Sequence, residues 1–470
     1  MQGYIKPDLV APASMIVSAR TQFQPTTARG FYCVENVDGN WYYEMDSGTS
    51  FAAPVAAGAA LLVERYLGSS PTSVSPAAVK AVLIAGAHSV RGGIDHSATP
   101  NIPVGPLPNT QQGFGRLSLD TVLTGATPPV VIDQTSQRHF TSSGQTRTTR
   151  LTVRDVSKPV AVALVWTDAP ATASVSNPLV NNLDLTIFPI AAPCTYRQGN
   201  FLSVDNQSRG EESVSTPCSQ TAPVDSVNNV EYARFFADGF STFDVRVAAS
   251  AINDVGDPGY STSPNQDFAL VVLNADLVNG GQVIAPQLTA ARDSVIPTNV
   301  HLSWTEPLNM IVDHYEVKRG STLANLSTVY PNEHGTTKDD LGLPSGVNTW
   351  VYQVTAVGTS ATSYSNTGIA TTIKFDDDPI TPFVTPIRAH HVEQLRQAID
   401  AIRSAAGLTA TNWTDGTSLL NVVIKAQHVS QMQGQLDAAL AQLSIPSNPY
   451  SPLTAYIKAQ NISEVRAHVQ

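Results

Sequence analysis

The 470-residue sequence is poor in cysteine, in charged residues and in long hydrophobic runs. Its three cysteines, Cys33, Cys194 and Cys218, are too few for a disulfide-based scaffold. The longest apolar run, Phe51 to Val63, has 13 residues, so we expect no membrane span, which needs about 20. Charged residues make up 14 % of the chain, and the net charge of -11 argues against a nucleic-acid partner.

The length predicts a multidomain globular protein, because one hydrophobic core rarely serves 470 residues. The N-terminal residues lack the basic and apolar regions of a signal peptide. The period of the hydrophobic pattern changes near Thr127, Gly281 and Asp377, and these changes predict domain boundaries. The predicted domains are 1–127, 128–280, 281–374 and 375–470.

Residues 46–58 carry the strongest sign of chemistry. They read Asp-Ser-Gly-Thr-Ser-Phe-Ala-Ala-Pro-Val-Ala-Ala-Gly, and so many small residues predict a tightly packed, buried helix that runs to about Tyr66. Gly48 permits a sharp turn before this helix, and Pro54 suits a first helical turn. Ser50 would then cap the helix N-terminus, where free N–H groups and the helix dipole favour an oxyanion. This is a suitable place for a nucleophilic serine.

Two other interpretations of Ser50 remain open. Serine and threonine before a helix are most often simple capping residues. The string Gly48-Thr49-Ser50-Phe51-Ala52 also differs at one residue from the Gly-x-Ser-x-Gly nucleophile elbow of α/β-hydrolases, and Ala52 breaks that pattern.

The serine string resembles the serine motif of the subtilisin-like proteases, the subtilases. Three further strings resemble that family in the same order: Lys6-Pro7-Asp8-Leu9-Val10-Ala11-Pro12, Ser75-Pro76-Ala77-Ala78-Val79-Lys80-Ala81-Val82-Leu83 and Gln112-Gly113-Phe114-Gly115-Arg116-Leu117-Ser118. The resemblance implies part of an α/β catalytic domain that acts on a protein or peptide substrate. It implies that Ser50 is the nucleophile and that its backbone N–H is one oxyanion donor. Asp8 would lie beside the substrate cleft, outside the triad.

The chain departs from the subtilase pattern before Ser50. The triad of that family follows the order Asp, His, Ser. No histidine precedes Ser50, and Asp8, Asp38 and Asp46 lie in no aspartate motif of the family. The strand with the oxyanion asparagine is missing too. We therefore expect a chain that starts inside a catalytic domain, is inactive as given, and leaves residues 1–127 poorly folded or bound to another surface.

Residues 130–279 alternate apolar and polar side chains with period two, which predicts an antiparallel β-sandwich or jelly roll. The strings Leu164–Asp168, Leu179–Leu185 and Asn228–Glu231 resemble the jelly-roll domain of one branch of secreted subtilases.

Three polar residues of this region, Asp168, Asn182 and Asp184, are candidate Ca²⁺ ligands, because calcium prefers oxygen donors. The favoured interpretation is that they are strand-end residues that satisfy buried backbone groups. Cys194 and Cys218 would pair in an oxidising compartment.

The C-terminal third carries two further patterns. Val300–Trp304, His314–Arg319 and Trp350–Val357 resemble the strands of a fibronectin type III domain, a β-sandwich. A helical pattern then begins at Ile387, Ile424 and Ile457, which are 37 and 33 residues apart, and this predicts an α-helical repeat. His391 and His428 hold equivalent positions, but Asn461 replaces the third member, so we expect repeat packing there and not a metal site.

We interpret the chain as the C-terminal part of a secreted, extracellular, bacterial subtilisin-like serine endopeptidase. Its fold class would be a partial α/β domain, a jelly-roll sandwich, a fibronectin type III sandwich and a helical repeat. The sequence establishes no cofactor, and Ca²⁺ is the one candidate. The C-terminal domains are candidates for cell-surface or polysaccharide contact. The alternative is a non-catalytic secreted adhesion or binding array with a vestigial protease segment, and the gene sequence upstream of Met1 distinguishes the two.

Overall fold

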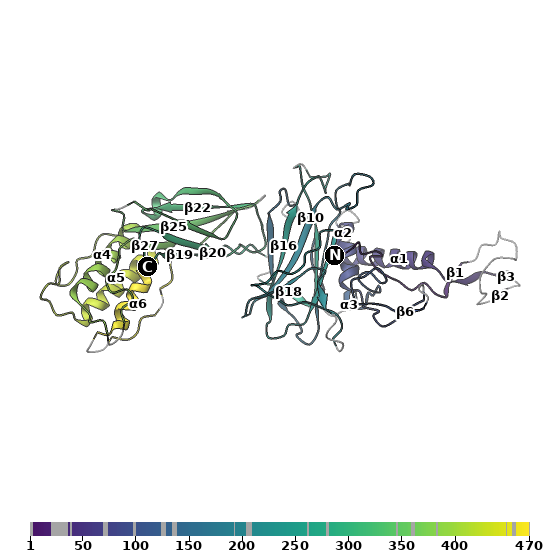
Figure 1. Cartoon of the computed structure of the whole chain (residues 1–470), viewed down its shortest axis with the longest axis horizontal. Coiled ribbons are helices and arrows are strands. Elements are labelled where there is room, and N and C mark those ends of the chain that lie inside the picture. The colour runs from purple at the N-terminus through teal and green to yellow at the C-terminus, as the bar shows by residue number, and fades with distance from the viewer. Residues whose placement is uncertain are drawn as a thin grey trace. The chain divides into compact units, whose positions relative to one another are not determined.

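The protein is multidomain and mostly β-sheet, with few helices (Figure 1). Two compact units, Met1–Gln282 and Val283–Gln470, divide the chain. The boundary residues Thr127 and Gly281, and Cys33, lie outside the described residues. The computed structural model describes residues 3–19, 36–37, 40–68, 74–96, 100–123, 128–133, 139–191, 193–203, 209–260, 263–278, 282–344, 346–358, 362–381, 384–447, 449–453 and 457–469.

Two antiparallel sheets form most of the N-terminal unit. One has the strand order β15-β9-β17-β7 and the other the order β14-β11-β10-β16-β8-β18. The long strands β10 and β16 lie side by side, with Leu185 opposite Val247 (Figure 1). The strand bounds are β7 (Val130–Ile132), β8 (Thr146–Val153), β9 (Val160–Val165), β10 (Asn182–Pro189), β11 (Thr195–Gln198), β14 (Thr216–Pro217), β15 (Val230–Phe235), β16 (Thr242–Ala251), β17 (Ala269–Leu273) and β18 (Ala275–Leu277).

The segment before the sheets contains helices and short strands. Its helices are α1 (Thr49–Leu67), α2 (Pro76–Ala85) and α3 (Asp120–Leu123). Its short strands are β1 (Ile16–Ala19), β2 (Asn36–Val37), β3 (Asn40–Trp41), β4 (Tyr43–Asp46), β5 (Ile94–Asp95) and β6 (Ile102–Pro103), and the later pair β12 (Leu202–Ser203) and β13 (Glu212–Ser213) completes the unit.

Helix α2 packs on strands β9 and β17 and joins this segment to the sheets. Ser75 caps the helix, with its Oγ accepting from the N–H of Ala78 at 2.9 Å. Ile84 is fully buried and shares one hydrophobic core with Ala163 and Val271. All six residues of β9 are buried, because α2 covers one face of the sheet and the second sheet lies on the other.

Cys194 and Cys218 form a disulfide with a Cα–Cα distance of 5.6 Å, which confirms the predicted pairing. The two residues flank the paired strands β11 and β14. The disulfide therefore ties the edge strand β14 to its neighbour.

The C-terminal unit has two sheets followed by three main helices. The sheets have the orders β19-β20-β24 and β23-β22-β25-β26, and β27 also pairs with β25. The bounds are β19 (Leu288–Arg292), β20 (Val300–Trp304), β21 (Ile311–Val312), β22 (His314–Gly320), β23 (Ser327–Glu333), β24 (Thr337–Asp340), β25 (Thr349–Val357), β26 (Thr362–Tyr364), β27 (Gly368–Thr371), α4 (Ala389–Ala405), α5 (Ala426–Gln442) and α6 (Ala459–Val469). In the described part of the chain, the helices are all too short or too polar to cross a bilayer.

The three C-terminal helices begin with the same local bond. The third residue of α4, His391, accepts through Nδ1 from the N–H of Arg388 at 3.2 Å. His428 of α5 makes the same bond to the N–H of Lys425 at 3.2 Å. In α6, Asn461 Oδ1 accepts from the N–H of the matching lysine at 3.0 Å. The shared requirement is an acceptor for an otherwise unpaired backbone N–H, which explains why asparagine replaces histidine.

The buried histidine of α4 predicts a pH-dependent stability. Burial lowers the pKa of His391 below its usual 6.5, although its hydrogen bond to Asp377 opposes the shift. As the pH falls, His391 therefore binds a proton more readily in the unfolded chain than in the folded one. The stability contribution is therefore complete above about pH 6.5 and falls as the pH decreases below that value.

We expect His391→Asn to reduce the loss of unfolding free energy at low pH. The asparagine can still accept from the backbone N–H of Arg388, as Asn461 accepts from the equivalent N–H in α6. Denaturant unfolding of wild type and variant between pH 7.5 and 5 measures the difference. Equal loss of unfolding free energy in both proteins would contradict the role of His391.

Candidate functional site

Ser50 is the second residue of α1 and is exposed. The helix follows a turn at Gly48, whose φ of 155° is one that L side chains rarely adopt. The N–H of Gly48 donates to the carbonyl of Ala13 at 2.8 Å, and Ser47 Oγ accepts from the N–H of Met15 at 2.8 Å. Two contacts thus fix the chain directly before Ser50 to the segment that leads into β1.

Strands β1 and β4 extend this attachment, with Ile16 opposite Asp46. The N–H of Ser50 lies in the first turn of α1, where N–H groups have no acceptor within the helix. The local geometry therefore offers a hydroxyl and a backbone donor on an accessible helix end. These are two of the groups that an acyl-transfer site needs.

Two sequence-based expectations about α1 are wrong. Gly48 is the N-cap residue, with no side-chain cap bond, so Ser50 does not cap the helix. The helix is also largely exposed: only Ala59 and Val63 are buried, while Leu61 is 65 % exposed. Small residues permit close packing but do not supply a partner, and no described sheet covers α1 as β9 and β17 cover α2.

The sequence suggested that Pro54 lies in the first turn of the helix. It lies in the second turn of α1. A proline at this position has no N–H to donate to the residue four places earlier, which is Ser50. The carbonyl of Ser50 therefore lacks its usual intrahelical bond.

The described residues bring no histidine base to Ser50. Within the described residues, no histidine ring lies within hydrogen-bond distance of its hydroxyl. His88 instead pairs through its backbone with Arg116, and its Nε2 lies 3.9 Å from Asp120. A serine hydroxyl without a base is a weak nucleophile.

Asp8 forms an ion cluster with two lysines, Lys6 and Lys80, each at 2.8 Å from its carboxylate. Burial alone would raise the pKa of Asp8, but the two ammonium groups outweigh burial and lower it. Sequence reasoning missed Lys80, because nothing in the pattern of α2 shows that this lysine reaches a residue 72 positions earlier. Asp8 is thus engaged with cations and not with Ser50.

The glycine-rich string at Gly113 and Gly115 packs directly against the Asp8 segment. The N–H of Phe114 donates to the carbonyl of Asp8 at 2.9 Å. Gly113 has a φ of 60°, and a Cβ there would lie 2.1 Å from the carbonyl oxygen of Pro7. Gly115 also has a positive φ, so the chain turns tightly here before the short helix α3.

The three candidate calcium ligands do not converge on one ion. Asp168 accepts from three backbone N–H groups, those of Ala169, Val180 and Asn181. Asp184 accepts from Ser250, and from Asn182 at 3.4 Å. Among the described residues, the groups of carboxylate and histidine side chains that could share a metal include neither aspartate.

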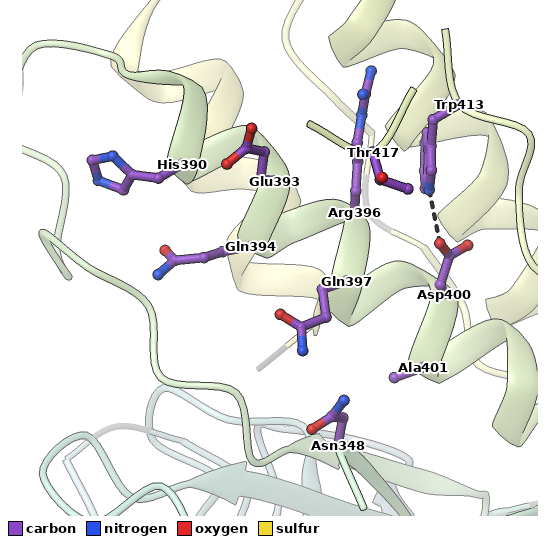
Figure 2. A pocket seen from close by; sticks show the side chains of 10 residues that line it. All are labelled: Asn348, His390, Glu393, Gln394, Arg396, Gln397, Asp400, Ala401, Trp413 and Thr417. Carbon is purple, nitrogen blue, oxygen red and sulfur yellow. Dashed lines mark hydrogen bonds between the residues drawn. The ribbon is translucent and has the colours of Figure 1, made fainter. Parts of the chain in front are cut away.

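A cavity of about 590 Å³ lies along α4 in the C-terminal unit (Figure 2). Its polar groups are largely engaged within the chain: Asp400 accepts from Trp413 Nε1 at 2.7 Å, and Arg396 donates to the carbonyl of Gly416. The Trp413 side chain is buried, so it offers no open ring face for a ligand. The other lining residues are Asn348, His390, Glu393, Gln394, Gln397, Ala401 and Thr417.

The four strings of the first 120 residues thus form one connected region: Ser50 on α1, the Asp8 cluster, α2 and the glycine turn. A family comparison covers the same stretch. Residues 1–115 match the subtilase family. The match includes Ser50, Asp8 and Gly113 and stops before the two large sheets.

Two curated relatives are distant serine protease homologues from Dictyostelium discoideum. The chain is 27 % identical over 286 residues to the serine protease/ABC transporter B family protein tagA. This match covers 57 % of the chain and 14 % of tagA. The chain is 29 % identical over 272 residues to the protein tagD of the same name. This match covers 49 % of the chain and 14 % of tagD. The chain thus spans about a seventh of the length of these relatives.

Among solved structures, an Fn3-like protein from Clostridium thermocellum matches 18 % of the chain and 86 % of its own length. Sequence identity is 26 % and the TM-score is 0.16. At that TM-score the similarity supports no conclusion about the fold.

The glycine turn in the subtilase-like region predicts a sharp contrast between two glycine substitutions. Gly113→Ala places a methyl group against Pro7 and strains a positive φ, so we expect it to lower the unfolding free energy of the N-terminal unit by at least about 2 kcal/mol. Gly58→Ala, in α1, meets nothing within 4 Å and should raise stability by up to about 1 kcal/mol. Denaturant melts of both variants provide the test, and equal effects would contradict the packing of this turn.

Proposed function

We propose that this chain carries the nucleophile-bearing part of a subtilisin-like serine endopeptidase, with Ser50 as the nucleophile. The observation that carries the proposal is an exposed serine in the first turn of α1, inside the stretch that matches the subtilase family. The family supports a protein or peptide substrate. Attack by Ser50 Oγ on the substrate carbonyl would form an oxyanion, which the Ser50 N–H can hold.

The described residues do not supply the groups that would complete this site. A base must remove the proton from Ser50, and a second group must orient that base. Among the described residues no histidine reaches Ser50, and Asp8 is held by two lysines. We propose that the 470-residue chain is therefore inactive alone and that a base-bearing segment must be supplied for hydrolysis.

We further propose that the protein is secreted and bacterial. The disulfide between Cys194 and Cys218 supports an oxidising, extracellular location. Residues 128–280 would form a jelly roll, 281–374 a fibronectin type III domain and 375–470 a helical repeat. The last two would contact a cell surface or a polysaccharide.

Peptide hydrolysis by the 470-residue chain tests the inactive state. We expect only background turnover and no labelling of Ser50 by a fluorophosphonate, because losing a triad member costs about 10⁴- to 10⁶-fold in subtilisin. Ser50→Ala should behave like wild type. Robust hydrolysis that Ser50→Ala abolishes and the neighbouring control Ser47→Ala preserves would show that the chain already contains a base.

A chimera tests the nucleophile assignment itself. Residues 46–67 of this chain replace the corresponding serine segment of an active subtilisin, which supplies the aspartate, the histidine and the oxyanion asparagine. We expect the folded chimera to hydrolyse peptides and to lose at least about 10⁴-fold in kcat with Ser50→Ala. A folded chimera whose activity survives Ser50→Ala would contradict the assignment, and circular dichroism verifies folding.

A further inference from the structure

A histidine and two aspartates meet at one end of the sheets in the N-terminal unit, far in sequence from Ser50. His139 precedes Phe140, whose backbone pairs with that of Gln266. Asp267 follows directly, and Asp257 comes from the loop after β16. One nitrogen or oxygen atom from each of His139, Asp257 and Asp267 lies within 4.8 Å of the other two. Three separate segments thus place a metal-ligating set of atoms at one point.

Two of these side chains are held in place by the surrounding chain. The His139 ring stacks on Tyr260, with ring centroids 4.0 Å apart and an interplanar angle of 5°. His139 Nε2 lies 2.8 Å from Asp257 Oδ2, while Asp257 Oδ1 accepts from the N–H of Gly259 at 2.9 Å. Contacts that orient ligands before an ion arrives are typical of metal sites.

The third side chain, Asp267, is the unexplained one. It is 1 % exposed, and its Oδ2 has no hydrogen-bond partner among the described residues. Its Oδ1 accepts from Gln266 Nε2 at 3.2 Å. Burial and the negative charge of Asp257 together raise the pKa of Asp267 to about 6. A buried carboxylate oxygen without a partner is costly, and a cation beside it would remove that cost.

We propose that His139, Asp257 and Asp267 bind one divalent transition-metal ion of the Zn²⁺ class. Imidazole nitrogen with carboxylate oxygen is a ligand set that suits Zn²⁺ and its neighbours, whereas Ca²⁺ takes oxygen ligands. Two carboxylates balance the charge of the ion. A water molecule would complete a tetrahedron.

Ligand atoms that lie within 4.8 Å of one another must move to hold a tetrahedral ion. Bonds of about 2.0–2.1 Å hold the ligands of a tetrahedral zinc about 3.4 Å apart. The 2.8 Å contact between His139 and Asp257 must therefore widen by about half an ångström. The ion would join the loop around Asp257 to the chain segments at Phe140 and Gln266, and so stabilise the N-terminal unit independently of Ser50.

The full 470-residue chain, without a histidine tag and treated with a chelator, provides the test. Calorimetric titration with Zn²⁺ should show one tight site, and Co²⁺ should produce the visible absorption of a tetrahedral complex. Zn²⁺ should also raise the Tm of the N-terminal unit. Asp267→Asn should weaken Zn²⁺ binding at least about tenfold and abolish the Tm shift, and it should fold well because it removes a buried charge. His139→Gln should do the same.

A matched control is His301→Gln, which removes an exposed histidine of β20 that contacts two carboxylates, Asp293 and Asp339. We expect this variant to bind Zn²⁺ like wild type. The proposal fails if wild type binds no Zn²⁺ in the micromolar range, if Asp267→Asn binds it as tightly as wild type, or if His301→Gln removes the binding.

Discussion

The packing of α2 on strands β9 and β17 is the interaction on which the N-terminal unit depends. It gives β9 a second buried face, and it joins the apolar residues of the subtilase-like segment to those of the sheet in one core. Ile84 on the helix and Val271 on the sheet are both fully buried in that core. Because α2 also carries Lys80, the same helix holds Asp8 in place and, through the Asp8 segment, the glycine turn. One hydrophobic contact thus organises the charged cluster and the backbone near it.

Features set by short-range physics could be predicted from the sequence. The Ser75 cap, the turn at Gly113 and the disulfide between Cys194 and Cys218 each depend on a local pattern or on simple counting. The course of α1 to Leu67 was close to the predicted end at Tyr66. The presence of a hydroxyl at the start of that helix was predictable too, and its assignment as a nucleophile stays a prediction.

Features set by distant partners could not be predicted. The exposure of α1 depends on what packs against it, and an alanine-rich sequence is compatible with either outcome. The partner of Asp8 is 72 positions away, and His139 and Asp257 are 118 positions apart, so no spacing rule connects them. The helices α4, α5 and α6 show a third case. The sequence shows that Asn461 stands where α4 and α5 have a histidine. Only the structure shows that all three side chains accept a hydrogen bond from a backbone N–H.

The disulfide has a consequence for how the molecule responds to damage. Cys194 and Cys218 enclose the chain from β11 to β14, and these two strands also pair directly. A single cut of the backbone anywhere between the two cysteines would leave both pieces covalently joined and the strand pair in register. The nicked protein would migrate as one chain until a reductant separated it into two. The enclosed segment can therefore be severed without detaching either half of the molecule.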